Sequence, residues 1–153
     1  WPRSATRRGA CMSIEPTVPL VAEIELSPAF HDLDPMDVVW HGHTLKYLEL
    51  ARCALLQGID YDYPQMRASG YVWPVVDLRC KYVRSARYGQ RLRVRAELTE
   101  WEMRMRIDYV IRDAETGEVI TRAHTLQVAV AIASGEMCYA TPEVFRRRLG
   151  LAA

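Results

Sequence analysis

The amino-acid sequence predicts an α+β domain, in which one long helix packs against an antiparallel sheet of about five strands. The first observation is a broad apolar stripe at helical spacing that runs from Gly42 or His43 to Gln57. The second is a change to a two-residue hydrophobic period from Tyr71 onward, which is typical of strands. The third is that the turns between these strands are short, as antiparallel neighbours allow. At 153 residues the chain can bury the core of one such domain.

Composition and charge exclude several classes of function. The chain holds 20 basic and 19 acidic residues, a net charge of +1, which gives no overall basic character for nucleic acid or an anionic membrane. No apolar run approaches the ~18 residues of a membrane-spanning helix. The 4 cysteines are scattered without a Cys-x-x-Cys pair, which favours free thiols in a cytoplasmic protein.

Residues 1–19 are predicted to form a flexible N-terminal tail. The tail has basic residues but lacks the apolar segment of a secretory signal. Met12 is a plausible natural start, so residues 1–11 are interpreted as an over-called start or an expression remnant. Residues 20–153 are predicted to be a single domain.

The first part of this domain is predicted to be a strand, a polar loop and two helices. Residues 22–26 alternate apolar and acidic side chains, as in a half-buried strand. The stripe of the long helix is so broad that its far side is also expected to be covered. Gly58 is expected to end this helix, and a short second helix follows over residues 61–68. The stripe consists of Thr44, Leu48, Ala51 and Leu55, broadened by Leu45, Tyr47 and Leu56.

Strands with alternating apolar residues are predicted over residues 71–82, 91–98, 103–112 and 119–133. Pro74 indicates an edge position or a bulge, because proline cannot donate to a sheet. A short helix is expected to follow, capped by Thr141 and ending near Leu149. A sheet of this kind leaves an edge strand, which homodimer or homotetramer formation would cover.

The loop before the long helix carries the most chemistry. Residues 31–43 hold three aspartates and three histidines around the apolar run Val38-Val39-Trp40. Catalytic groups are often placed on loops held by rigid elements. A carboxylate beside an imidazole can serve as a nucleophile or a general base. A solvated acidic turn is the alternative, but an apolar run is unusual in one.

The segment from Asp34 to Arg52 resembles the hot-dog-fold acyl-CoA thioesterases of the 4-hydroxybenzoyl-CoA thioesterase and YbgC type. Their signature is an Asp, three residues that often end in Gly, an apolar pair, an aromatic residue, and His or Tyr before a helix that ends in Glu-x-Ala-Arg. The signature falls here on Asp34, Val38-Val39, Trp40 and His41, and on Glu49 to Arg52. The resemblance extends roughly over residues 22–149. It implies a hot-dog fold, a long central helix wrapped by a curved antiparallel sheet.

This sequence departs from the family pattern at three positions. Asp37 stands where Gly is common, and Gly permits a positive φ and close approach of the backbone. Asp can tolerate this φ but adds a charge. His43 stands where Asn is common. Thr44 stands where Tyr is common, which opens volume near the acyl group and leaves the acyl specificity undefined.

The resemblance implies hydrolysis of a thioester by Asp34, acting as a nucleophile or as a general base on water. Both roles need an ionised carboxyl group and therefore modest burial or compensating hydrogen bonds. Backbone N–H groups around Val39, Trp40 and His41 are candidates to polarise the thioester carbonyl. His41 is predicted to donate to this carbonyl or to orient Asp34, with a structural helix cap as the alternative.

Other residues are predicted to contact the substrate or to shape the site. Asp37 could order a water, support His41 or cap the helix, and the cap is favoured. His43 is interpreted as a helix-start or interface residue. Tyr47 and Trp73 are candidates for an acyl or aryl pocket, with plain core packing as the alternative.

The phosphates of coenzyme A would need basic partners. Lys81, Arg84 and Arg87 around the turn after residue 82 are the candidates, and a solvated loop is the alternative. No cofactor is implied. A metal site on Asp34, Asp37, His41 and His43 is disfavoured, because residues two apart at a helix start point in different directions.

The sequence thus predicts an acyl-CoA thioesterase that releases a free acid. The substrate is predicted to be an acyl-CoA or an acyl-carrier protein, without binding to nucleic acid or insertion into a membrane. The alternatives are a hot-dog module that binds an acyl thioester without cleaving it, and a hot-dog dehydratase, since fold alone does not separate these functions.

Overall fold

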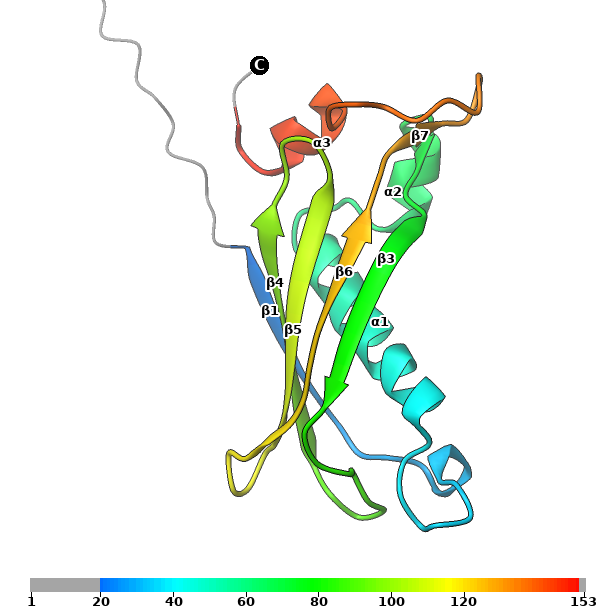
Figure 1. Cartoon of the computed structure of the whole chain (residues 1–153). Coiled ribbons are helices and arrows are strands. Elements are labelled where there is room, and N and C mark those ends of the chain that lie inside the picture. The colour runs from blue at the N-terminus through cyan, green and yellow to red at the C-terminus, as the bar shows by residue number, and fades with distance from the viewer. Residues whose placement is uncertain (1–19, 152–153) are drawn as a thin grey trace, which may run out of the picture.

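The computed structural model describes residues 20–151. Five strands form one antiparallel sheet in the order β1-β4-β5-β6-β3, and the long helix α1 runs behind it (Figure 1). A separate two-stranded pair, β2 with β7, lies beyond one end of β3 and β6. The strands of the large sheet are β1 (Val21–Leu26), β3 (Val75–Tyr82), β4 (Leu92–Glu100), β5 (Met105–Asp113) and β6 (Val119–Gln127). The remaining elements are β2 (Tyr71–Val72), β7 (Val130–Ala131), the 3-10 turn η1 (Phe30–Asp32), α1 (His41–Gln57), α2 (Tyr63–Ala68) and α3 (Glu143–Arg148).

The core lies between α1 and the face of the sheet that we call the inner face. The predicted stripe of α1 is confirmed, because Thr44, Leu48, Ala51 and Leu55 are all buried. Alternate residues of the central strands meet it, while the outer face of the sheet is rich in charged side chains, as the two-residue period requires. The buried strand residues are Leu92, Val94, Ala96 and Leu98 of β4 and Met105, Ile107, Tyr109 and Ile111 of β5.

Two of the predicted long strands are interrupted. The strand predicted over residues 71–82 breaks at Trp73 and Pro74, and the one predicted over 119–133 breaks at residues 128–129. At the first break the carbonyl oxygen of Trp73 accepts a hydrogen bond from Nε2 of Gln127 at 2.8 Å. The register also shifts between Val75 and Asp77, and β3 is an edge strand. The interpretation of Pro74 as a mark of an edge strand or bulge is therefore confirmed.

The predicted cap of the C-terminal helix is wrong. The hydroxyl of Thr141 donates to the carbonyl oxygen of Trp101 at 2.7 Å, and α3 begins at Glu143 without a side-chain cap. Thr141 therefore ties the C-terminal segment to the turn between β4 and β5. This hydrogen bond satisfies both the hydroxyl of Thr141 and the carbonyl oxygen of Trp101. If Thr141 capped α3 instead, the carbonyl oxygen would lose this partner.

The edge strand β3 is exposed along almost its whole length. Its inner face carries Leu78 and Tyr82, whose exposed fractions are 37% and 45%. On α1, Leu50 is also exposed. An exposed apolar edge strand is a surface that proteins normally cover or protect.

None of the helices within residues 20–151 is long and apolar enough to cross a membrane. Cys53, Cys80 and Cys138 are free thiols, and Cys11 lies outside the described residues together with the predicted tail.

Candidate active site

The loop between η1 and α1 is a tight turn that fixes the carboxylate of Asp34. An isolated bridge between Leu33 and Val39 closes the turn. The amide of Asp34 donates to the carbonyl oxygen of Val38 at 2.8 Å. In return, Oδ1 of Asp34 accepts from the amides of Met36 at 2.8 Å and Val38 at 3.4 Å. These bonds hold one carboxylate oxygen, so the other is left for a substrate or a water.

Asp37 shapes this turn through its backbone. Its φ is 59°, in the left-handed region, where Asp is one of the few residues other than glycine that is tolerated. Asp37 thus adopts the positive φ that glycine permits at this position. The favoured interpretation of Asp37 as a helix cap is wrong, because α1 follows Trp40 without any side-chain cap and Asp37 is exposed.

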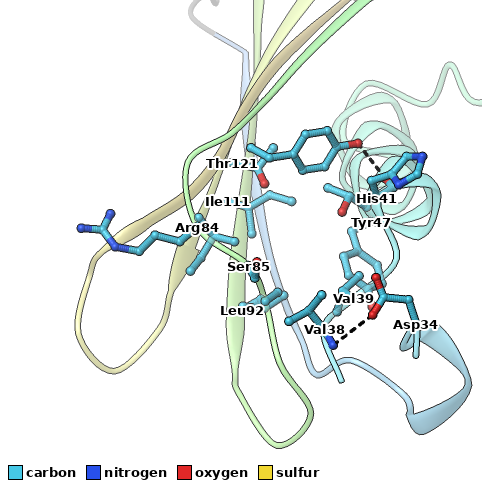
Figure 2. Close-up of a pocket in the computed structure, with 14 residues that line it drawn as sticks. Asp34, Val38, Val39, His41, Tyr47, Arg84, Ser85, Leu92, Ile111 and Thr121 are labelled. Atoms are coloured by element: carbon cyan, nitrogen blue, oxygen red, sulfur yellow. Dashed lines mark hydrogen bonds between the residues drawn. The ribbon is translucent and has the colours of Figure 1, made fainter. Parts of the chain in front are cut away.

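A pocket of about 190 Å³ opens between this loop, the start of α1 and the ends of β3 and β6 (Figure 2). It is smaller than the several hundred Å³ of typical small-molecule sites. It can therefore take only the reacting end of a larger substrate. Predicted residues that line it are Asp34, Val39, His41, Thr44, Tyr47 and Arg84. The remaining lining residues, which were not predicted to contact the substrate, are Val38, Tyr82, Ser85, Ala86, Leu92, Ile111, Ile120 and Thr121.

The backbone amides at the start of α1 differ in their availability. The amide of Val39 donates to the carbonyl oxygen of Ala86 at 2.8 Å, and the amide of Trp40 donates to that of Asp32 at 2.9 Å. These two predicted donors are thus already engaged. The amides of His41 and Gly42 have no acceptor within residues 20–151, because the first turn of a helix lacks intrahelical partners. The amides of His41 and Gly42 are therefore the remaining candidates to donate hydrogen bonds to a thioester carbonyl oxygen as it becomes negatively charged.

His41 is held at the pocket by its backbone. Its carbonyl oxygen accepts a hydrogen bond from the Tyr82 hydroxyl at 2.7 Å (Figure 2). Burial raises the pKa of Tyr82 to about 12, with Cys80 contributing, so this donor stays protonated at physiological pH. The exposed imidazole of His41 packs beside the ring of Trp40, with the ring centroids 4.9 Å apart. It also meets the Tyr82 ring edge-on, with the ring centroids 6.4 Å apart.

Asp32 is a central residue of the loop that sequence reasoning missed. It is buried, and its Oδ2 accepts hydrogen bonds from the Tyr47 hydroxyl at 2.7 Å and the Ala29 amide at 3.0 Å. Nδ1 of His43 lies 3.3 Å from Oδ1. Burial alone would raise the pKa of Asp32, but the bonds from Tyr47 and Ala29, with His31 and His43 nearby, bring this pKa below its usual value. Asp32 thus anchors the loop to α1 as an ionised group.

We expect Asp32→Asn to lower the free energy of unfolding by about 1–3 kcal/mol at neutral pH, because a buried bond to a charged acceptor is lost. A lowered pKa in the folded state stabilises the protein above the ordinary carboxyl pKa, and this stabilisation is lost as the pH falls through the folded-state pKa. The difference between variant and wild type should therefore shrink below about pH 4. Urea unfolding at a series of pH values measures it, with the exposed Asp37→Asn as control. A difference that stays constant with pH would contradict an ionised Asp32.

Several predicted residues lie away from this pocket. Trp73 is a core residue, packed between Tyr61 and Phe145 with ring centroids 6.4 and 4.9 Å away. Plain core packing was the predicted alternative to a place for Trp73 in an acyl or aryl pocket. Glu49 and Arg52, the family-like end of the helix motif, form an ion pair of 2.5 Å that does not line the pocket.

The three basic residues that were predicted to bind the phosphates of coenzyme A do not come together in the structure. Lys81 lies on the outer face of β3, whereas its neighbour Tyr82 lines the pocket. Arg84 lines the pocket, but its side chain extends away from it and pairs with Glu118 at 3.3 Å (Figure 2). Arg87 lies in the exposed turn before β4. No group of three His, Cys, Asp or Glu side chains that could hold a metal ion occurs in the described part of the chain.

The arrangement combines the components of acyl transfer. A carboxylate with one free oxygen faces a pocket lined by both polar and apolar side chains, and unpaired amides at a helix start can stabilise negative charge on an oxygen.

Comparisons with known proteins point to the same chemistry. Residues 28–149 match the thioesterase-like superfamily. A protein of Synechocystis sp. that is named as an esterase is 32% identical over 120 residues, which cover 78% of this chain and 72% of that protein. A Bacillus subtilis protein named as an acyl-CoA thioesterase, YneP, is 30% identical over 70 residues, which cover 46% of this chain and 51% of that protein.

A solved structure confirms the predicted fold. A crystal structure of 4-hydroxybenzoyl-CoA thioesterase superposes with a TM-score of 0.74 at 16% identity, covering 85% of this chain and 99% of that chain. The central helix and the antiparallel sheet are therefore those of the hot-dog fold. Since the superfamily match extends over residues 28–149, this chain belongs to the thioesterase-like superfamily.

Proposed function

We propose that this protein hydrolyses an acyl or aryl thioester of coenzyme A, with Asp34 as the acting carboxylate. The observation that carries the proposal is that Asp34 and His41 line the same pocket, at the start of α1 where the amides of His41 and Gly42 are unpaired. The superfamily match and the acyl-CoA thioesterase named among the relatives support the substrate class.

Asp34 has two routes to the same products. As a nucleophile, its carboxylate attacks the thioester carbon, the C–S bond breaks, and coenzyme A leaves as the thiolate; water then cleaves the mixed anhydride. As a general base, Asp34 takes a proton from the water that attacks the same carbon. In both routes negative charge develops on the carbonyl oxygen, where the amides of His41 and Gly42 would stabilise it. The imidazole of His41 can donate a further hydrogen bond to this oxygen.

The side of the pocket that the sheet forms suits an apolar acyl end. It consists of the buried side chains of Leu92, Ile111 and Ile120. Thr44 is buried at the helix side and leaves the space that an aromatic ring would fill. The hydroxyl of Tyr47 is already bonded to Asp32, so it contributes its ring and not a free polar group to the substrate.

We also propose that the protein is a homo-oligomer whose basic unit is a dimer paired through β3. The exposed apolar inner face of this edge strand supports the pairing. Because Tyr82, at the end of β3, lines the pocket, a partner on β3 would adjoin the site, which we propose is shared between subunits.

A cytoplasmic location is proposed from the free thiols Cys53, Cys80 and Cys138.

The proposal is tested by following thioester absorbance over short, long and aromatic acyl-CoAs. Direct absorbance avoids thiol reagents, which the cysteines of the protein would consume. We expect hydrolysis of at least one acyl-CoA, and slower cleavage of the p-nitrophenyl oxygen ester of the same acyl group. Saturable binding of acyl-CoA without turnover would instead identify a binding module. Turnover of the oxygen ester alone would identify an esterase and contradict the proposal.

A further inference from the structure

The outer face of the sheet carries a basic groove that the proposed chemistry does not use. The groove has a volume of about 400 Å³ and is lined by residues of β3 and β6, on the face of the sheet opposite to the pocket. Figure 1 shows these two strands side by side, with α1 behind the sheet. The residues that line it are Arg79, Cys80, Lys81, Arg122, Ala123 and His124. We call this set the basic groove.

The positive charges of the basic groove are not neutralised within residues 20–151. Lys81 lies directly opposite Arg122 in the strand register, and Arg79 lies opposite His124. Like charges directly opposite each other on neighbouring strands destabilise a sheet. None of Arg79, Lys81 and Arg122 forms an ion pair in the described part of the chain. The groove therefore presents free positive charge that a bound anion would relieve.

The opposite edge of the same sheet shows the contrast. There Arg93 lies 3.3 Å from a carboxylate oxygen of Glu23 and 3.1 Å from one of Glu25, and Arg91 lies 3.5 Å from Glu25. The arginines on that edge are thus matched by acids across the strands. The unpaired cations of β3 and β6 are a local feature, which the net charge of +1 conceals.

Among residues 20–151, carboxylates approach the basic groove only at its His124 end. Asp77 lies 3.9 Å from Nε2 of His124, and Asp108, which is opposite His124 on β5, is paired with Arg106 at 3.1 Å. The Lys81 end has no such neighbour. Negative charge on a partner is therefore attracted chiefly toward the end that leads to the pocket.

The basic groove and the pocket lie back to back on the same stretch of β3 and β6. Lys81 and Arg122 line the groove on the outer face, while Tyr82 and Thr121, their immediate neighbours in sequence, line the pocket on the inner face. Arg84, just beyond the end of β3, also lines the pocket. A partner on the groove therefore sits within reach of the pocket by way of the strand ends.

We propose that the basic groove docks an acidic protein that carries the thioester substrate on a flexible arm. The inference rests on the proposed thioesterase function and names the carrier of its substrate. The charges complement an acidic protein surface, and the open groove has no aromatic ring other than the His124 imidazole on which a nucleotide base could stack. In the proposed dimer, two such grooves would adjoin along the paired β3 strands.

Binding of a fluorescent, acidic acyl carrier protein, followed by anisotropy, tests this docking directly. We expect saturable binding to the full-length protein that weakens as salt is raised, because exposed charges are screened. Arg122→Glu should weaken binding about tenfold or more. Arg67→Glu is the matched control, since it makes the same change of charge at an exposed arginine of α2, away from the groove, and should bind as the wild type does. Thermal unfolding confirms that both variants are folded.

Measurements of turnover show whether the groove binds the acidic carrier protein or the phosphates of coenzyme A. The acyl group that is cleaved fastest as its coenzyme A ester is also mounted on the carrier protein. Arg122→Glu should lower kcat/KM for the carrier-bound thioester about tenfold and leave the acyl-CoA value within about twofold. An equal loss on both substrates would assign the groove to coenzyme A phosphates and overturn the docking proposal.

The remaining outcomes are also decisive. Absence of carrier binding, or equal binding by the wild type and Arg122→Glu, overturns the proposal even if acyl-CoAs are hydrolysed. If the protein binds no carrier but binds vesicles that contain phosphatidylglycerol, and Arg122→Glu abolishes this binding, the groove is a membrane-binding surface and the proposal is overturned. If the protein cleaves no thioester but binds the carrier, and Arg122→Glu weakens this binding, the docking is supported and the proposed hydrolysis is contradicted.

Discussion

Asp34→Asn is expected to lower the turnover of acyl-CoA by about a hundredfold or more while leaving the protein folded. Asparagine keeps the size of the side chain and its carbonyl oxygen, so the bonds from the amides of Met36 and Val38 can persist. It removes the negative charge that both proposed routes require, and general base catalysis alone is typically worth about 10²–10⁴ in rate. The measurement is kcat from thioester absorbance, with thermal unfolding as the check on folding.

Asp37→Asn is the matched control for this substitution. It removes the same charge from the same turn, at an exposed residue whose positive φ asparagine also tolerates. Its effect on kcat should be smaller than that of Asp34→Asn by at least about tenfold. Full activity in a folded Asp34→Asn protein would remove Asp34 from the mechanism, and equal losses in the two variants would point to the charge of the loop as a whole.

Leu78→Lys is expected to convert the protein to a monomer and to abolish most of its turnover. Leu78 lies on the exposed apolar inner face of β3, so a lysine there costs the isolated subunit little. An inward-pointing charge on an edge strand opposes pairing with a second sheet. Because the site is proposed to be shared across this edge, the monomer should be inactive. Sedimentation velocity and kcat, measured on the same sample, check both parts.

Met103→Lys controls for the introduction of a lysine at an exposed apolar position away from β3. It should keep both the oligomeric state and the turnover of the wild type. A monomeric Leu78→Lys protein with full activity would contradict the shared site. So would a wild-type protein that is a fully active monomer at nanomolar concentration.

Much of the fold could be predicted from the sequence, because its signals are local. The stripe of α1 follows from helical spacing, and the buried residues of β4 and β5 follow from alternation. Pro74 marked the irregular edge strand because a missing N–H is a property of the residue itself. The positive φ of Asp37 agrees with the resemblance, since glycine is common at this position in the family.

The missed features depend on contacts between residues distant in sequence. Asp32 gains its role from Tyr47, 15 residues away, and nothing in the spacing of the two indicates a hydrogen bond. Thr141 looks like a helix cap, but the carbonyl oxygen of Trp101, 40 residues earlier, accepts its hydroxyl. Local propensity yields to such tertiary contacts when they satisfy a buried polar group.

The basic residues after β3 show a different kind of error. Lys81 and Arg84 are close in sequence and were grouped for that reason. The two-residue period of a strand already places Lys81 and Tyr82 on opposite faces, so alternation would have separated Lys81 from the pocket. Its pairing with Arg122 across the strands, which forms the basic groove, follows only from the sheet register.

The most direct test of the central claim is a crystal structure of the Asp34→Asn protein with an acyl-CoA that it binds without hydrolysing. We predict that the thioester carbon lies beside the side chain of residue 34 in the pocket, with its carbonyl oxygen within hydrogen-bond distance of the amides of His41 and Gly42. A thioester bound outside this pocket, or one whose carbonyl oxygen points away from the start of α1, would contradict the account.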